Sequence, residues 1–172
     1  RIKETLLYPY ENYKAGSPLV FKCQNAMAAA VGDICGNGFE DIVFACRDKS
    51  AGMESSWIYP GSSEGWKEEK RIAFKTLNAC DTVVADFSGD KGLDVAIGQS
   101  HSKESFTSEI LIFPSRKGKH PDFSAPVRLP SHDACRIFAI NTGKGRKPHL
   151  VVCNHRSGSL IGNPDNVIYM GG

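Results

Sequence analysis

Short apolar runs, separated by clusters of turn-forming residues, make up most of this 172-residue chain. No run keeps the amphipathic helical period of about 3.6 residues, and runs such as 79–85 and 94–98 carry β-branched side chains. Seventeen glycines and nine prolines supply turn residues between the runs. The pattern therefore predicts an all-β chain of short strands.

The pattern of apolar and polar residues repeats along the chain. The segments 26–45, 79–98 and 134–153 align without a gap, and each opens with alanine. The polar residues Asp33, Asp86 and Asn141 share one aligned position, and Asp41, Asp94 and His149 share another. The first of these positions recurs after 53 and then 55 residues, and such a period is typical of repeat architectures.

The remainder of each period repeats as well. An apolar–aromatic run occurs around Tyr8, Tyr59, Phe113 and Tyr169, and the first three of these runs are each followed by one more apolar run. Each period therefore predicts four short strands, which is the blade of a β-propeller. The expected repeat units are approximately 26–78, 79–133 and 134–172, with 1–25 as the end of a preceding blade.

The loop 86–94 places oxygen-bearing groups at alternate positions between two predicted strands. These groups are the side chains of Asp86, Ser88, Asp90 and Asp94 and the carbonyl of Gly92. Alternate positions of a tight loop can converge, and Ca²⁺ takes about six to eight oxygen ligands in irregular geometry. Asp, Gly and Ser also dominate ordinary turns, so a metal-free turn is the alternative interpretation.

Two segments, GDICGNGFEDIVFA (32–45) and ADFSGDKGLDVAIG (85–98), resemble FG-GAP/VCBS repeats, and the strand SWIYPGS (56–62) is similar to a common variant in that group. Integrin α-subunit propellers and many bacterial surface proteins contain these repeats. Their recurring element is an apolar strand, a loop of the form Asp-x-Asx-Gly-Asp-Gly-x-x-Asp and a second strand. The resemblance covers nearly the whole chain and implies a structurally calcium-dependent β-propeller.

The resemblance also implies a calcium site in the loop 33–41. The expected ligands there are the side chains of Asp33, Asn37 and Asp41 and the carbonyl of Phe39. Cys35 replaces an oxygen ligand in this loop, and a thiol is a poor ligand for Ca²⁺. The third loop, 141–149, has Lys147 and His149 at ligand positions, so we expect hydrogen bonds to stabilise its turn in place of calcium.

Six cysteines lie at positions 23, 35, 46, 80, 135 and 153, and their spacing defines neither a disulfide framework nor a C-x-x-C pair. Cys80 and Cys135 occupy matching repeat positions, where the first repeat has Met27. On innermost propeller strands these three sulfur atoms would lie at similar height. A ring that binds a soft metal is one interpretation, and small apolar packing is the favoured one.

Charge and hydropathy exclude some partners. The net charge is +2, and the basic clusters 116–120 and 143–149 lie on predicted turns. Solvated loop charge is the favoured interpretation of these clusters, and contact with an anionic partner such as phosphate or an acidic glycan is the alternative. No nucleic-acid partner is therefore expected, and the absence of a run of about 18 apolar residues excludes a helical membrane span. A calcium module of this kind needs extracellular calcium levels, which points to an extracellular, cell-surface or periplasmic location.

The predicted strands add up to little more than three blades, whereas propellers close with about four to eight. An open array would leave unpaired strand edges and an exposed flank. We therefore expect a longer parent, other propeller chains or further copies of this chain to complete the ring. The start at Arg1, with neither methionine nor a signal segment, indicates a processed chain or a fragment.

No catalytic motif occurs, and the five histidines fall on predicted turns or strand ends. The sequence therefore predicts a non-enzymatic module that uses its blade loops for protein binding or assembly. One alternative is a lectin-like glycan binder, with Trp66 as the candidate exposed aromatic. A propeller-borne hydrolase or lyase is the third interpretation, and in all three the fold alone does not determine function.

Overall fold

The computed structural model describes residues 4–47, 55–102, 105–116, 119–143, 145–155 and 165–171. Within these residues the chain forms antiparallel sheets, and its one helical element is a short 3-10 turn, η1 (Glu68–Lys70). The all-β prediction is confirmed. In the part of the chain described here, no helix is both long and apolar enough to cross a lipid bilayer.

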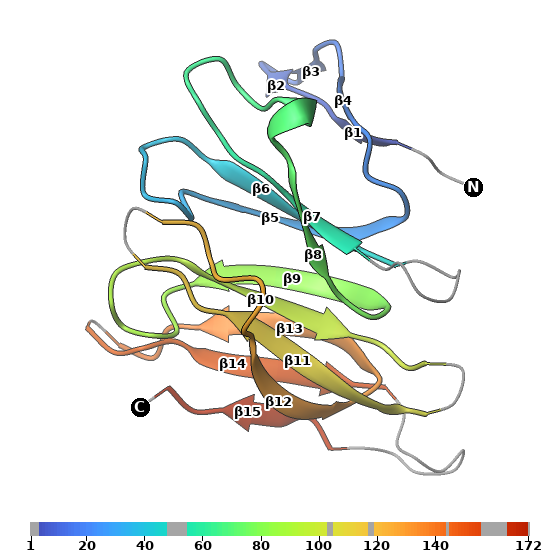
Figure 1. The fold of residues 1–172 in the computed structure, drawn as a ribbon, viewed down its shortest axis with the longest axis vertical. Helices are drawn as coiled ribbons and strands as arrows, with labels where there is room; N and C mark the ends of the chain where they lie inside the picture. Colours follow the sequence, from blue (N-terminus) through green and yellow to red (C-terminus); the bar gives the residue numbers. More distant parts are fainter. Residues whose placement is uncertain are drawn as a thin grey trace.

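Among the described residues, four sheets follow one another along the chain, and a fifth, two-stranded sheet is a separate hairpin (Figure 1). Sheet 1 pairs β1 (Thr5–Leu7) with β4 (Leu19–Phe21), and the hairpin of β2 (Tyr10–Glu11) and β3 (Lys14–Ala15) lies between them in sequence. Sheet 2 contains β5 (Ala26–Gly32), β6 (Asp41–Cys46), β7 (Ser55–Tyr59) and β8 (Ile72–Lys75). Sheet 3 contains β9 (Ala79–Ala85), β10 (Asp94–Gln99), β11 (Thr107–Phe113) and β12 (Val127–His132). Sheet 4 contains β13 (Ala134–Ile140), β14 (His149–Asn154) and β15 (Val167–Tyr169).

The first two strands of sheets 2, 3 and 4 form three matching hairpins. Each hairpin pairs a strand of seven residues with a strand of six. At the loop end the paired residues are Gly32 with Asp41, Ala85 with Asp94, and Ile140 with His149. Towards the other end each hairpin has a β-bulge, whose extra residues are Met27, Cys80 and Cys135. Backbone pairing thus reproduces the gap-free sequence alignment.

A left-handed residue precedes each of these hairpins. The φ angles of Asn25, Asn78 and Asp133 are 53°, 47° and 48°. Asn and Asp tolerate this conformation better than other residues with a Cβ. The carbonyl of each accepts an N–H from the residue after the second strand, namely Arg47 (3.0 Å), Ser100 (3.0 Å) and His155 (3.1 Å). This bond closes the open end of every hairpin.

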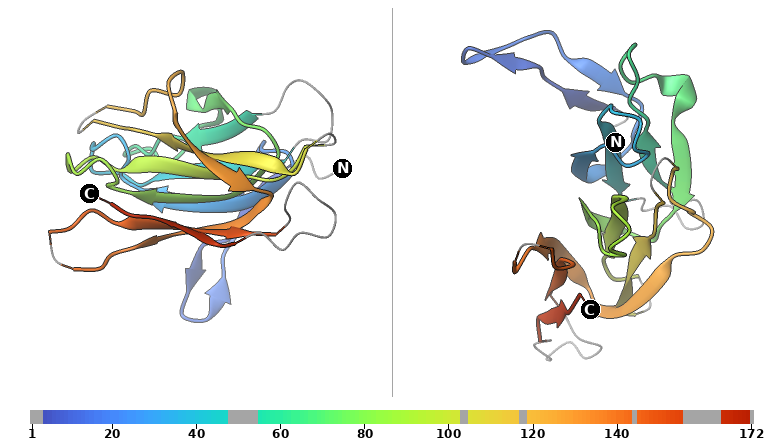
Figure 2. Two further views of the ribbon diagram at one scale, coloured as in Figure 1. Left: turned by 90° about the horizontal axis from the view of Figure 1, so that it is seen from below. Right: turned by 90° about the vertical axis from the view of Figure 1, so that its left-hand side faces the viewer.

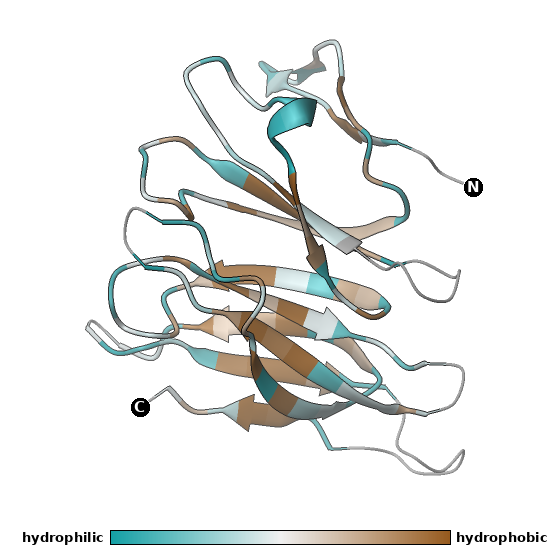
Figure 3. Ribbon diagram, viewed as in Figure 1, coloured by the Kyte–Doolittle hydropathy of each residue, from teal (hydrophilic) through white to brown (hydrophobic). Residues whose placement is uncertain are grey.

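Successive sheets pack face to face and enclose apolar cores. Phe21 of sheet 1 packs with Phe44 and Tyr59 of sheet 2. The opposite face of sheet 2 packs on sheet 3 through Val43, Ile58, Phe74, Val95, Ile97 and Phe113. The opposite face of sheet 3 packs on sheet 4 through Ala96, Ile110, Ile137, Leu150 and Val152. Alternate residues of one strand therefore serve different cores, which explains the apolar strand centres in Figure 3.

Sheet 4 has an apolar face that no described part of the chain covers. In sheet 2 the cross-strand pair Val43 and Ile58 is buried against sheet 3, and in sheet 3 the pair Ala96 and Ile112 contacts the core shared with sheet 4. The matching pair in sheet 4 is Val151 and Ile168, and Phe138 pairs with Val151 on its other side. Ile168 is 57% exposed and Phe138 is 49% exposed. We call Phe138, Val151 and Ile168 the end face.

The β2–β3 hairpin projects away from the stacked sheets (Figure 2). Its two turn residues, Asn12 and Tyr13, have φ angles of 49° and 61°. Two positive φ angles are the feature of a type I′ turn, which matches the twist of a two-residue hairpin. The ring of Tyr13 lies edge-on to Tyr10 with centroids 6.5 Å apart. The pattern of apolar and polar residues does not predict this hairpin.

Candidate functional site

The loop between β5 and β6 is organised around the buried carboxylate of Asp41. Its Oδ2 accepts the N–H groups of Ile34 (2.9 Å) and Cys35 (3.0 Å), and its Oδ1 accepts the N–H of Gly61 (2.7 Å). Gly61 follows β7, so this one side chain connects the loop to the end of the third strand. A Cβ built on Gly61 would overlap the carbonyl of Glu40, so the close approach requires glycine.

The other predicted ligands of this loop also accept backbone hydrogen bonds. Asp33 accepts the N–H groups of Asn37 and Gly38, each at 2.9 Å. Asn37 accepts the N–H of Phe39 through its side-chain oxygen (2.9 Å) and donates its side-chain N–H to the carbonyl of Gly61 (3.1 Å). Each carboxylate oxygen of Asp33 accepts only one N–H and therefore keeps a lone pair that can bind a cation.

Ligand atoms of Asp33, Cys35 and Asp41 lie within 4.8 Å of one another, and this is the one such trio found among the described residues. The Cys35 thiol contacts Asp41 Oδ1 at 3.7 Å. Burial, together with the neighbouring Asp41 charge and hydrogen bond, raises the pKa of Cys35 to about 11. The thiol is therefore protonated at neutral pH, and the oxygens of Asp33 and Asp41 are the ligands that suit a hard cation.

The loop between β9 and β10 has the same framework. Asp94 is buried and accepts the N–H groups of Ser88 and Ser115, each at 2.8 Å. Burial raises the pKa of Asp94, and this effect is larger than the lowering of the pKa by the two hydrogen bonds. Ser115 follows β11, as Gly61 follows β7, so the connection between loop and third strand is repeated.

The remaining carboxylates of the loop 86–94 fold back on its backbone. Asp86 accepts the N–H groups of Gly89 (2.6 Å) and Lys91 (3.0 Å), and Asp90 accepts the N–H of Gly92 (2.8 Å). Asp86, Asp90 and Asp94 do not form a trio as close as the one in the first loop. The structure therefore places these predicted ligands in one loop without drawing their side chains to one point.

The third loop achieves the same connection with histidine. The Nδ1 atom of His149 accepts the N–H of Gly171 (2.8 Å), and its Nε2 atom lies 3.1 Å from the hydroxyl of Thr142. Gly171 follows β15, so it matches Gly61 and Ser115. The expectation that hydrogen bonds stabilise this turn is confirmed.

A second candidate site lies at the opposite ends of the same hairpins. A cavity of about 320 Å³ is lined by the three bulge residues Met27, Cys80 and Cys135. It is also lined by Arg47, Ser100 and His155, which occupy matching positions directly after β6, β10 and β14. The three sulfur-bearing side chains therefore share one environment, as their spacing suggested.

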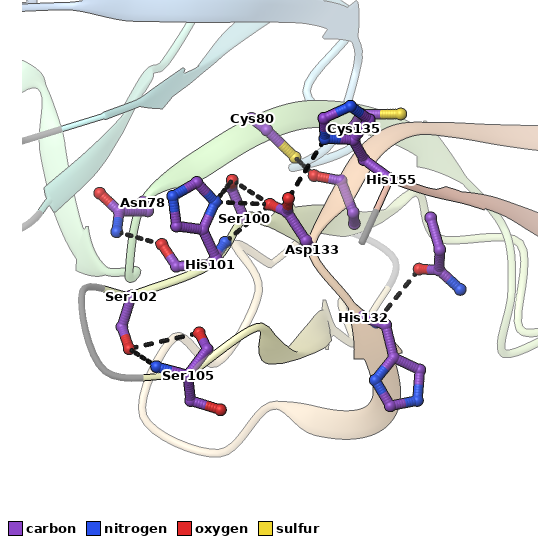
Figure 4. Close-up of polar contacts among 12 residues, drawn as sticks. Asn78, Cys80, Ser100, His101, Ser102, Ser105, His132, Asp133, Cys135 and His155 are labelled. Carbon is purple, nitrogen blue, oxygen red and sulfur yellow. Dashed lines mark hydrogen bonds and ion pairs between the residues drawn. The ribbon is translucent and has the colours of Figure 1, made fainter. Parts of the chain in front are cut away.

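Asp133 is the centre of a polar cluster beside this cavity (Figure 4). One carboxylate oxygen accepts the Ser100 hydroxyl (2.6 Å) and the backbone N–H of His101 (3.0 Å) and lies 2.8 Å from His101 Nδ1. The other oxygen lies 3.4 Å from His155 Nδ1. Burial would raise the pKa of Asp133, but the hydrogen bonds from Ser100 and His101 outweigh it and lower the pKa to about 2.

The cluster contains serine, histidine and aspartate, but its geometry is not that of a catalytic triad. Ser100 contacts His101 at Nδ1, which is also the atom nearest to Asp133. A triad needs the serine on one ring nitrogen and the aspartate on the other. Cys80 donates to the carbonyls of Ala134 (2.9 Å) and Gly98 (3.2 Å), and burial raises its pKa to about 12. Neither the hydroxyl of Ser100 nor the thiol of Cys80 is therefore arranged as an activated nucleophile.

Trp66 is half-buried rather than freely exposed. Its indole N–H donates to the carbonyl of Glu40 (2.7 Å), and its ring packs on Phe21 with centroids 6.2 Å apart. The sequence predicts an exposed Trp66 because the residues around it are typical of a turn. A role of Trp66 in glycan binding stays a prediction.

Sequence reasoning missed Asp133, His101 and Arg47 as members of one site. The available signal was the recurrence of Asn25, Asn78 and Asp133 directly before the aligned alanines. No protein-family model matches the chain, and no curated protein matches it either. The function must therefore be inferred from the geometry of its own residues.

Proposed function

We propose that this protein is a β-propeller segment of FG-GAP/VCBS type and that it acts as an assembly module. The end face carries the proposal: Ile168 is 57% exposed and its partner Val151 is only half-buried, whereas their counterparts Val43 and Ile58 are fully buried against the next sheet. A further sheet of the same kind, from another copy or from a longer polypeptide, is the surface that fits this pattern. Such packing would extend the stack towards a closed ring.

The other end of the stack supports the same proposal. Leu6 and Val20 form a cross-strand pair in sheet 1 and are 46% and 52% exposed. Their neighbours Leu7 and Phe21 point to the opposite face and pack against sheet 2. Each end of the stack therefore offers an apolar sheet surface, and association of the two ends would remove both from water.

Native mass spectrometry and light scattering of the 172-residue chain test the assembly proposal. We expect dimers or larger rings, and we expect Ile168→Glu to weaken association at least tenfold because a buried charge replaces an apolar contact. Leu77→Glu is the matched control, since Leu77 is 47% exposed and lies outside both ends. A compact, protease-resistant wild-type monomer at high concentration would contradict the proposal.

We further propose that Ca²⁺ stabilises the loops 33–41 and 86–94. Asp33 fits this role best, because each of its two oxygens accepts a single N–H and keeps a lone pair for a cation, and water would supply the remaining ligands. Asp41 lies close to Asp33, but it already accepts three N–H groups and contacts the protonated thiol of Cys35. Bound calcium would offset the repulsion between the carboxylates within each loop. The affinity expected for an extracellular module, with a Kd of about 10⁻⁴–10⁻³ M, fits an extracellular, cell-surface or periplasmic location.

Thermal unfolding of chelator-treated protein tests the calcium proposal. Calcium at about ten times its Kd should stabilise the fold by about 1.4 kcal/mol, which corresponds to a rise in Tm of about 3–6 °C. The double variant Asp33→Asn with Asp86→Asn should lose this rise, whereas Asp122→Asn, outside both loops, should keep it. No rise at 10 mM calcium, or an equal rise in the double variant, would show that the loops are metal-free turns.

A further inference from the structure

The cavity beside Asp133 has an excess of cationic groups. Arg47 and Arg136 line it and are permanently charged, and His101 and His155 line it as well. The carboxylate of Asp133 faces these groups, but Ser100 and the two histidines already contact its oxygens. Arg136 is 3.8 Å from Asp81, which balances part of its charge.

Arg47, which lines this cavity, combines a permanent charge with an unsatisfied hydrogen-bond donor. Its Nε atom is buried and has no hydrogen-bond partner among the described residues. A buried donor without an acceptor destabilises the fold, and more so when it belongs to a charged group. The Nε atom itself has almost no accessible surface, so a ligand in the cavity would contact the terminal N–H groups of Arg47 instead. The planar guanidinium suits two oxygen atoms of a carboxylate or phosphate.

A metal ion fits the cavity less well than an anion. The His, Cys and Asp side chains that line it do not form a close trio of ligand atoms. Burial raises the pKa values of Cys80 and Cys135, so both thiols are protonated at neutral pH and are poor metal ligands. Two guanidinium groups also repel a cation.

We propose that this cavity binds a small molecule through a phosphoryl or carboxylate group. Arg47 binds the oxyanion directly, and His101 and His155, whose Nδ1 atoms contact Asp133, line the same cavity. Arg136 adds charge to the cavity lining, and its side chain is 63% exposed. The site lies on the edges of sheets 2, 3 and 4 and does not include the end face, so its occupation is a separate property from assembly.

Imidazole NMR signals of His101 and His155 provide the test. Inorganic phosphate and succinate are titrated separately at constant ionic strength near pH 6.5, and we expect saturable shifts with a Kd below about 5 mM for at least one of them. Shifts with phosphate alone assign a phosphoryl ligand, and shifts with succinate alone assign a carboxylate ligand. No saturable shift with either probe up to 50 mM overturns the proposal.

Arg47→Gln should weaken the binding at least tenfold. Arg128→Gln is the matched control, because Arg128 pairs with Glu109 on the outer strands of sheet 3 and should leave binding unchanged. Equal affinities of the two variants overturn the proposal.

A second measurement uses only the wild-type protein, in case Arg47→Gln does not fold. Bound phosphate or succinate, whichever shifts the imidazole signals, should slow the alkylation of Cys135 in the cavity relative to Cys153 outside it. An unchanged ratio of the two alkylation rates at saturating probe overturns the proposal.

Discussion

At the scale of single residues, the last loop position couples each hairpin to the strand that follows it. Asp41, Asp94 and His149 differ in charge, yet each accepts a backbone N–H from beyond the third strand of its sheet. A buried carboxylate that accepts several N–H groups contributes strongly to folding, because its removal leaves those donors unsatisfied. The clustered aspartates of the loops thus have a structural role with or without a cation.

Asp41→Ala should lower the free energy of unfolding by about 2–4 kcal/mol, because Ile34, Cys35 and Gly61 would each lose an acceptor. Urea unfolding monitored by circular dichroism measures the change. Glu64→Ala, at an exposed position on the surface, should cost no more than about 0.5 kcal/mol. Equal losses for the two variants would show that the buried carboxylate has no special role.

Asp133 should make stability depend on pH in the acid range. Its pKa falls from 3.8 in the unfolded chain to about 2 in the folded protein, so its stabilising contribution is fully present above about pH 4 and is lost as the pH falls through about 2. Asp133→Asn removes this titration, so the stability difference between wild type and variant should shrink as the pH falls from 4 to 2.

Asn already occupies the matching positions 25 and 78, so the Asp133→Asn variant is expected to fold. Chemical unfolding of both proteins at a series of pH values measures the difference. A difference that stays constant from pH 4 to pH 2 would contradict the shifted pKa of Asp133.

At the scale of elements, the repeat in the sequence determines the hairpin register. Strand and loop lengths match in all three hairpins because the apolar alternation and the terminal polar residue of the loop recur together. The β2–β3 hairpin could not be predicted in this way. Its turn uses Tyr13 at a positive φ, where Gly, Asn or Asp is the usual signal, and only Asn12 follows that preference.

The cavity could not be predicted for a different reason. Arg47, His101 and His155 come from three connections far apart in the sequence, and they meet only because sheets 2, 3 and 4 stack in order. A repeat alignment finds positions that share a residue type, as for Met27, Cys80 and Cys135. It does not find a site that three repeats build from different residues.

Gly61→Ala tests the contact between the end of β7 and the loop before β6. The added Cβ would overlap the backbone carbonyl of Glu40, so the chain must shift and weaken the Gly61 hydrogen bond to Asp41. We expect a loss of about 2–4 kcal/mol in denaturant unfolding. Gly16→Ala is the control, because the nearest atom to its Cβ lies at an ordinary 3.5 Å. A loss in Gly61→Ala no larger than in the control would disprove the constraint.

At the scale of the whole molecule, sheets 2 and 3 are covered on both faces, whereas the described residues cover only one face each of sheets 1 and 4. Apolar surface on both ends favours association, and association stabilises the folded state by mass action. The stability of this chain should therefore depend on its own concentration.

A hundredfold increase in protein concentration should stabilise an associating chain by up to about 2.7 kcal/mol, which raises Tm by several degrees. Differential scanning calorimetry over this range measures the effect. Ile168→Glu should abolish the dependence, and Leu77→Glu should retain it. A wild-type Tm that is independent of concentration would count against assembly through the end face.

Three backbone hydrogen bonds close the open ends of the hairpins, and they affect the folding kinetics. They run from Arg47 to Asn25, from Ser100 to Asn78 and from His155 to Asp133. Each hairpin is pinned at both ends by contacts between residues close in sequence, so its formation requires little loop-closure entropy. Folding can therefore nucleate in any of the three hairpins and spread to its neighbours, as in other repeat proteins. Amide hydrogen exchange should then show three protected kernels of similar lifetime, one in each hairpin, in place of a single central nucleus.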